Sequence, residues 1–359
     1  MKNPPQFIFG NLASDIPAGV VVYLVALPLC LGVALASTGR SDLLFSGIIA
    51  GVVGGIVVGA LSGSALGVSG PAAGLVVIVL NALDTLGSYE KFLLAVVLAG
   101  GLQIIAGFFQ TGGIGYYFPS SVIKGMLAAI GLTLILKEIP HALGFDEDYM
   151  GDMAFESKNG SNTLTDLYHA VRYSSMGAIV LSLLSLGILV FFDRPFMKNI
   201  KLFRFLPGAL VVVLVGMLVN YLFGIYVPHL AMGVKHLVSL PVANTPSAFL
   251  SFLKFPDLTG FSDPNVYVVA FTLAIIASLE TLLSVEATDK LDPFKRTTPT
   301  SRELQAQGVG NIVSGLIGGL PVTQVIVRSS ANIESGGRTK LSAIIHGLIL
   351  LLSALFIPR

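Results

Sequence analysis

The chain has no tryptophan, one cysteine and few charged residues. Charged side chains make up 11% of its 359 residues, whereas about a quarter of the residues in an average soluble domain are charged. A water-soluble protein of this size needs far more polar groups to cover its surface, which excludes a soluble enzyme, a nucleic-acid-binding protein and a disordered chain. The single cysteine, Cys30, excludes an internal disulfide, and its apolar sequence neighbours indicate a packing role.

Apolar residues are abundant instead. Hydrophobic residues make up 54% of the chain, and the mean hydropathy is +0.84. The 40 glycines and 18 prolines follow no collagen repeat, so they indicate closely packed and interrupted membrane helices. The first apolar run leads directly into a second, which favours a first membrane span over a cleavable signal peptide. These features predict a multi-pass protein of the cell membrane, here a bacterial inner membrane, with the lipid bilayer as its surroundings.

The apolar runs predict an all-α polytopic fold. A membrane-spanning helix needs about 20 mostly apolar residues. On this criterion eleven spans are expected, at 16–37, 43–61, 71–86, 91–110, 118–137, 175–192, 205–223, 266–287, 305–318, 323–334 and 341–357. The third, ninth and tenth of these are too short to cross a bilayer alone.

Charge is distributed unequally between the connections. Basic residues gather in 193–204 and 288–303 and at Arg338 and Lys340, whereas 138–174 is acidic. Counting spans places the basic connections on one side of the membrane and the acidic connection on the other. The positive-inside rule therefore predicts a cytoplasmic N-terminus and an outer loop at 138–174.

The sequence contains an internal repeat. A small-residue span followed by a proline break occurs at 47–79 and again at 308–329, and Pro71 and Pro321 lie 250 residues apart. Seven spans separate the corresponding elements, and because that number is odd the two halves are expected to be inverted in the membrane. A complete second repeat would extend well beyond Arg359, so we expect a C-terminally incomplete transporter that does not transport by itself.

Both proline breaks predict an anion site. A Gly-Pro pair cannot continue a preceding helix, and proline suits the first turn of a new one. Two helix amino ends that point at one shared pocket at membrane depth, each carrying roughly half a positive charge, would together attract an anion. A proline kink at a helix contact, with no ligand, is the alternative. The candidate substrate-binding residues are Ser69, Gly70, Ala72, Ala73, Thr323, Gln324, Val325, Ile326 and Arg328.

Two ionisable residues lie within apolar spans. Arg328 follows the second break, where a charge costs at least about 2.5 kcal/mol and needs a role, and its guanidinium suits an oxyanion. The alternative is an ion pair that only braces the fold. Glu280 is expected to hold a proton, to pair with Arg328 or to bind a cation, and Ser284 shares its helix face. Glu280 and Ser284 are therefore the candidate coupling-ion residues.

No catalytic or cofactor motif is present. The five histidines have no metal-ligand spacing, and we find no zinc-protease, phosphate-loop or nucleophile-elbow motif. The sequence therefore predicts no enzyme activity, no metal site and no cofactor other than a coupling ion, H⁺ or Na⁺.

Several motifs resemble those of the sulfate permease (SulP) family, which includes prestin and bacterial sulfate and bicarbonate transporters. The resemblance covers essentially the whole chain. The motifs that resemble those of the family are Asp15 with Pro17-Ala18-Gly19, Ala26-Leu27-Pro28, Ser69-Gly70-Pro71, SLETLLSVEATD (278–289), RELQAQGVGNIVSGLIGGLP (302–321) and RSSANIESGGRTKLS (328–342).

The resemblance implies seven plus seven inverted helices, divided into a core domain and a gate domain, with half-helices at spans three and ten and a cytoplasmic STAS domain after them. Substrate would lie between the starts of these half-helices, with Arg328 helping to hold the anion and Glu280 linked to H⁺ or Na⁺ coupling. A homodimer is implied for the complete protein. The corresponding regions are a cytoplasmic N-terminus at 1–15, the core at 16–117 and 266–359, the first part of the gate at 118–224, and an extracellular connection at 225–265; the remaining gate helices and the STAS domain would be absent.

The identity of the anion stays open at this point. Leu29 replaces a glutamine of many sulfate- and chloride-type relatives, and ALPLCLGVALASTG (26–39) is more similar to bicarbonate-type members, whereas Arg328 is similar to the sulfate and chloride type. We predict a secondary transporter of a small inorganic anion and favour sulfate, followed by bicarbonate and chloride. The alternatives are a nucleobase permease on the same plan, which should lack an intramembrane arginine, and an anion channel.

Overall fold

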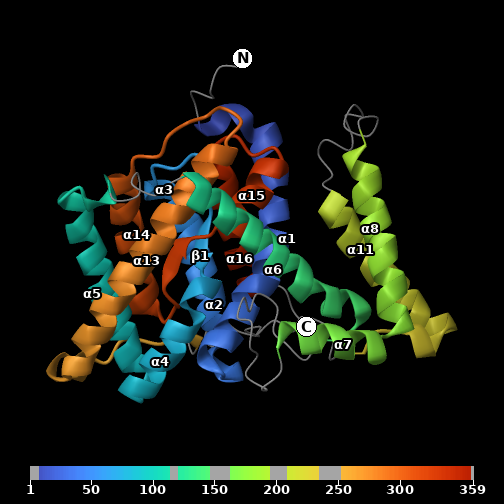
Figure 1. The fold of residues 1–359 in the computed structure, drawn as a ribbon, viewed down its shortest axis with the longest axis horizontal. Helices are drawn as coiled ribbons and strands as arrows, with labels where there is room; N and C mark the ends of the chain where they lie inside the picture. The colour runs from blue at the N-terminus through green and yellow to red at the C-terminus, as the bar shows by residue number, and fades with distance from the viewer. Residues whose placement is uncertain (1–7, 114–119, 146–161, 195–207, 234–251, 357–359) are drawn as a thin grey trace. The chain divides into compact units, whose positions relative to one another are not determined.

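The computed structural model describes residues 8–113, 120–145, 162–194, 208–233 and 252–356. These residues are mostly helical (Figure 1). The chain divides into two compact units, the first formed by Met1–Gly125 with Leu240–Arg359 and the second by Met126–Ser239.

The first unit combines helices from both ends of the chain. Its α-helices are α1 (Leu12–Thr38), α2 (Leu44–Val53), α3 (Gly59–Leu61), α4 (Val76–Leu86), α5 (Tyr89–Phe108), α13 (Pro264–Leu291), α14 (Thr300–Ile317), α15 (Ile326–Glu334) and α16 (Leu341–Phe356). A π-helical turn, η3 (Gly54–Val58), joins α2 to α3, and a 3-10 turn, η4 (Ala73–Leu75), precedes α4. Two short strands, β1 (Ser69–Pro71) and β2 (Val322–Gln324), pair with each other.

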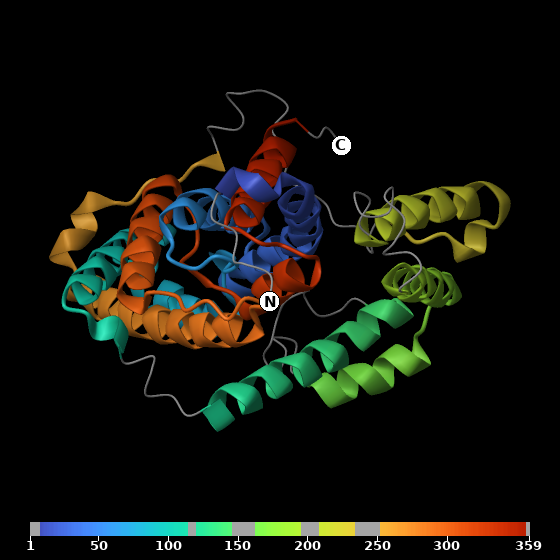
Figure 2. The same ribbon diagram turned by 90° about the horizontal axis from the view of Figure 1, so that it is seen from above.

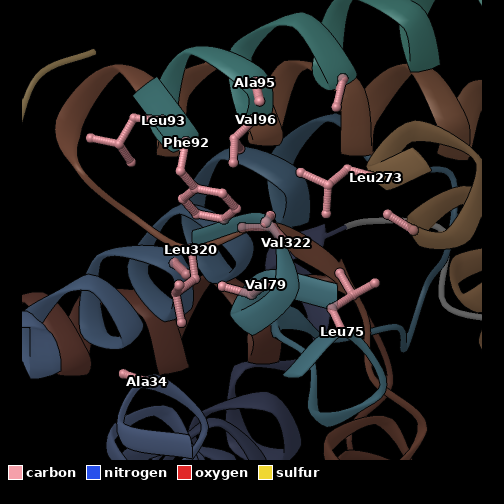
Figure 3. Packing of buried hydrophobic residues seen from close by; sticks show 14 of the residues in the cluster. Ala34, Leu75, Val79, Phe92, Leu93, Ala95, Val96, Leu273, Leu320 and Val322 are labelled. Carbon is pink, nitrogen blue, oxygen red and sulfur yellow. The ribbon is translucent and has the colours of Figure 1, made fainter. Parts of the chain in front are cut away.

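Apolar packing joins the two sequence halves inside this unit. Helix α5 packs against α13 and α14, and α1 packs against α16 (Figures 1 and 2). Phe92 of α5, Leu273 of α13 and Val79 of α4 gather around Val322 of β2, and all four are buried (Figure 3). The strand pair is therefore embedded in the core.

Local signals fix where the long helices begin. Ser88 accepts a hydrogen bond from the Lys91 backbone N–H and caps α5. Asp263 accepts from the Asn265 backbone N–H and caps α13, whose first residue is Pro264. This bond, together with the ion pair to Lys91 at 3.1 Å, holds the pKa of the Asp263 carboxyl below its ordinary value.

The second unit is also helical. It contains most of α6 (Ser120–Leu143), with α7 (Thr163–Arg172), α8 (Met176–Asp193) and α11 (Gly208–Tyr226). Large apolar side chains of α8 and α11, such as Leu183 and Met217, are exposed, as expected for helices that face lipid.

The expected spans correspond to these helices with different ends. Within the described residues, Leu12–Thr38, Ser41–Leu61, Tyr89–Phe108, Gly208–Tyr226 and Pro264–Leu291 are each long and apolar enough to cross a membrane. Helices α7 and α8 form a further candidate span that is bent by 109°. The count of eleven spans and the inverted relation of the two halves stay predictions. The expected loop at 138–174 contains α7, and its residues 146–161 lie outside the described part.

Two sequence-based expectations are wrong in detail. Pro71 ends β1 and Pro321 precedes β2, so neither proline lies in the first turn of a helix. The following helices begin only at Ala73 and Ile326. The intervening residues are extended because each break pairs with the other, and the all-α prediction therefore misses a small sheet.

Gly54 packs directly against the backbone of β1. A Cβ at this position would overlap the carbonyl group of Ser69, whereas at Gly59 the nearest atom to an added Cβ would be 3.5 Å away. Gly54→Ala should therefore lower the midpoint of thermal unfolding by several degrees, because overpacking costs about 1–3 kcal/mol. Gly59→Ala is the matched control and should unfold at the same temperature or slightly higher. Equal midpoints for the two variants in detergent would contradict this packing.

Candidate functional site

The two sequence breaks pair with each other inside the first unit. Strands β1 and β2 run antiparallel, and all six of their residues are buried. The paired residues are Ser69 with Gln324, Gly70 with Thr323, and Pro71 with Val322. The Val325 N–H also donates to the Val68 carbonyl at 2.9 Å. Segments about 250 residues apart in the sequence therefore form one short ladder.

The helices after the breaks leave this ladder at opposite ends. Turn η4 and helix α4 follow β1, and α15 follows β2. Because the strands are antiparallel, Ala72 and Val325 lie at opposite ends, about 13 Å apart by the rise of about 3.3 Å per strand residue. Neither residue provides a side-chain cap. Two helix amino ends, each with uncapped N–H groups and a partial positive charge, therefore flank the ladder.

Arg328 lies in the first turn of α15 and extends over the ladder. Its side chain occupies the space beside Gly70, where an added Cβ would overlap Nη1. The residue is 1% exposed, and Nε and Nη1 have no hydrogen-bond partner. Within the described residues no carboxylate forms an ion pair with it, so a bracing ion pair is not observed there. Its charge acts on two further buried side chains, Cys30 of α1 and His346 of α16.

Glu280 lies at the other helix start. An added Cβ on Gly74 in η4 would be 2.8 Å from its Oε1 atom. Its Oε2 atom is buried without a hydrogen-bond partner, and among the described residues it forms no ion pair with Arg328. Ser284, one turn further along α13, is also buried. The carboxyl group thus faces the beginning of α4, whereas Arg328 covers the middle of the ladder.

The structure brings most of the predicted site residues together. Ala72 and Ala73 lie at the start of η4, with Ala72 buried and Ala73 half-buried. Val325 precedes α15, and Ile326 opens it with 5% of its surface exposed. Ser69, Gly70, Thr323 and Gln324 form the ladder itself. Ala72 and Val325 are not adjacent; they mark its two ends.

Two threonines of α13 also contact the ladder, and neither is among the site residues proposed from the sequence. The Gln324 N–H donates to Thr281 Oγ1 at 3.4 Å, and its side-chain Nε2 donates to Thr288 Oγ1 at 3.0 Å. Both threonines are buried. Their seven-residue spacing places them on one helix face, and this polar pair in an apolar span was the available signal.

Several buried acceptors and donors around the ladder remain unpaired. Thr323 Oγ1, Gln324 Oε1 and the two Arg328 nitrogens have no partner. A buried polar group without a partner costs about 1–3 kcal/mol. The arrangement can therefore gain stability from a small polar ligand, and the guanidinium favours an anionic one. Within the described residues, no group of three or more His, Cys, Asp or Glu side chains is placed to hold a metal ion.

Two solved structures have a fold similar to that of this chain. The transmembrane domain of a cyanobacterium bicarbonate transporter, BicA, matches with a TM-score of 0.62 and 26% identity, over 97% of this chain and 84% of that one. The structure of SLC26A9 matches with a TM-score of 0.59 and 18% identity, over 98% of this chain and 55% of that one, and indicates the fold alone.

Curated relatives extend this similarity to the sequence. A Bacillus subtilis (strain 168) protein named "Putative sulfate transporter YvdB" is 27% identical over 94% of this chain and 59% of its own length. The bicarbonate transporter BicA of Synechocystis sp. is 26% identical over 96% of this chain and 57% of its own length. The chain thus spans less than two thirds of these relatives. The family profile described as the sulfate permease family matches residues 12–359, and the chain therefore belongs to this family of membrane transporters and is not an enzyme.

Proposed function

We propose that this chain binds and carries a small inorganic anion as part of a secondary active transporter, with sulfate favoured, followed by bicarbonate and chloride. The observation that carries the proposal is the buried Arg328 guanidinium beside Gly70, with two of its nitrogens unpaired. An oxyanion would accept from these nitrogens, and the partial positive charges of the two helix amino ends, one at each end of the ladder, would attract it. The relatives named as sulfate and bicarbonate transporters support an anionic substrate.

The charge of the site favours a divalent anion. The guanidinium contributes one positive charge, and each helix amino end contributes roughly half a charge. The sum of about two charges matches sulfate, whereas bicarbonate or chloride would neutralise only half of it. Glu280 in its charged form would lower this sum, so its protonation or its binding of a cation would accompany anion binding.

The effect of the Glu280 charge on anion binding suggests how anion transport is coupled to H⁺ or Na⁺. H⁺ or Na⁺ at Glu280, with Ser284 one turn away, would remove a negative charge from the site that holds the anion. We propose that the core domain (16–117 and 266–359) then moves against the gate domain (118–224) and exposes the site alternately to each side. We further propose that the protein lies in a bacterial inner membrane with its N-terminus in the cytoplasm, and that the complete transporter is a homodimer.

A nucleobase permease is less favoured. A neutral ring would leave the Arg328 charge buried without compensation, which is costly in a membrane interior. An anion channel uses the same charges but conducts without a transport cycle. Conductance far above carrier rates would favour the channel.

Arg328→Ala should weaken sulfate binding at least about thirtyfold, because truncating a partner in a buried charged contact costs about 2 kcal/mol or more. Isothermal titration of the purified protein measures the effect, with the unfolding midpoint as a check of the fold. Arg40→Ala is the control, because Arg40 is exposed and pairs with Asp42. An unchanged sulfate affinity in a folded Arg328→Ala protein would refute the site.

Glu280→Gln should leave anion binding intact and make uptake insensitive to pH and sodium gradients, because the amide cannot gain or lose the charge that couples the two ions. Labelled-sulfate uptake into proteoliposomes that contain the full-length transporter, with and without each gradient, measures this. Glu286→Gln, on the same helix but in an ion pair with Lys290, should keep the gradient response. Equal sensitivity in the Glu280 variant would reject coupling through this residue.

A further inference from the structure

Helix α14 presents a row of polar side chains to the core. Glu303, Gln307, Asn311 and Ser314 follow one another at intervals of four, four and three residues and therefore share a helix face. Each is at most 2% exposed. Four buried polar residues on one face need partners. We call them the α14 polar row, and apart from the unpaired Gln307 Oε1 their polar atoms form hydrogen bonds in and around the ladder.

Asn311 holds β2 from the side. Its Oδ1 accepts from the Val322 N–H at 2.6 Å, and its Nδ2 donates to the Val322 carbonyl at 3.0 Å. One amide thus satisfies both backbone groups of a strand residue. The same Nδ2 donates to Gln103 Oε1 on α5, and Gln103 in turn donates to Ser278 on α13. Asn311 therefore fixes β2 relative to two further helices.

Gln307 holds β1 in a corresponding way. Its Nε2 donates to Ser69 Oγ at 2.7 Å and to Glu303 Oε1 at 3.0 Å. Glu303 accepts from Ser62 Oγ and from the Gly63 N–H, in the segment that leads to β1. The row therefore fixes β1 both directly and through its preceding loop.

The spacing of the two contacts matches the ladder. Gln307 and Asn311 are four residues apart, a rise of about 6 Å along the helix. The residues they hold, Ser69 and Val322, belong to the first and last of the three ladder pairs, which are about 6.6 Å apart by strand rise. Helix α14 thus spans the whole ladder and contacts one strand at each end.

Such support is needed because the ladder is very short. An isolated two-stranded pair is marginally stable even with longer strands. Gly70, which Arg328 lies against, is in the central pair between the two contacts. A shift of either strand would therefore move the surface that positions the guanidinium.

We propose that Gln307 and Asn311 of the α14 polar row are positioning residues that hold β1 and β2 in register and thereby set the geometry of the anion site. The proposal rests on the proposed function, because the geometry matters for binding only if the anion lies at Arg328. The residues act through the ladder, since their polar atoms contact its strands.

Gln307→Leu tests this proposal against a matched control on the same helix. Gln305→Leu makes the same exchange at a half-buried position whose side chain packs beside Gly107 of α5. We expect Gln307→Leu to raise the dissociation constant for sulfate about tenfold, the ratio that corresponds to one buried hydrogen bond, and Gln305→Leu to leave it unchanged. Both are measured by isothermal titration at a temperature where each protein is folded.

Two further readouts separate positioning from general stability. In the Arg328→Ala background, Gln307→Leu should cause no additional loss of affinity, because the guanidinium it helps to position is gone. A lower unfolding midpoint with unchanged sulfate affinity would overturn the proposal and assign the row to stability alone. If Gln307→Leu fails to fold, Gln307→Met, which keeps the length of the side chain and removes its amide hydrogen bonds, is measured in its place, and unchanged affinity there overturns the proposal equally.

The two proposals fail in distinguishable ways. If Arg328→Ala binds sulfate normally, the proposed function is wrong, whatever the row does. If Arg328→Ala loses binding while Gln307→Leu and Gln305→Leu behave alike, the site stands and the positioning role is wrong.

Discussion

The organisation of the site follows from the need to satisfy backbone polar groups away from water. A helix interrupted at membrane depth exposes N–H and C=O groups that lipid cannot satisfy. Here the two interrupted segments satisfy each other, through a three-residue antiparallel ladder that joins distant parts of the sequence. The ladder leaves the amino ends of two helices uncapped at its ends. The ladder that satisfies the backbone groups of the two breaks therefore also places two partially positive helix ends near each other and creates a region of positive potential.

Arg328 is the residue by which we propose that this region of positive potential binds a specific anion. Its side chain fits over the ladder only because Gly70 lacks a Cβ, and its buried nitrogens remain available to a ligand. The carboxyl group of Glu280 lies at the other helix start. In the proposed function, an anion at Arg328 and a cation at Glu280 would bind beside the same short ladder, and this proximity would couple their transport.

The sequence is most informative at residues whose polarity or backbone geometry does not suit an apolar membrane helix. The prolines at the breaks and the charges at Arg328 and Glu280 stand out in apolar runs, so they could be recognised without coordinates. The strands could not, because three residues show no periodicity and the partner of each lies about 250 positions away. The sequence marks Gly70 only as a residue of the first break. Its contact with the Arg328 side chain is known only from the structure. Asn311 and Gln307 could not be recognised from the sequence either, because a single amide in a helix of small residues gives no sign of what it contacts.

Locating a bound anion tests most directly whether the anion lies at Arg328. Selenate has the shape and charge of sulfate, and its selenium atom scatters anomalously, so a crystal of the protein soaked in selenate reveals the position of the anion. An anomalous peak is expected within hydrogen-bond distance of the Arg328 guanidinium, beside Gly70 and Thr323. A selenate ion bound tightly elsewhere, with the Arg328 nitrogens still unpaired, would contradict it.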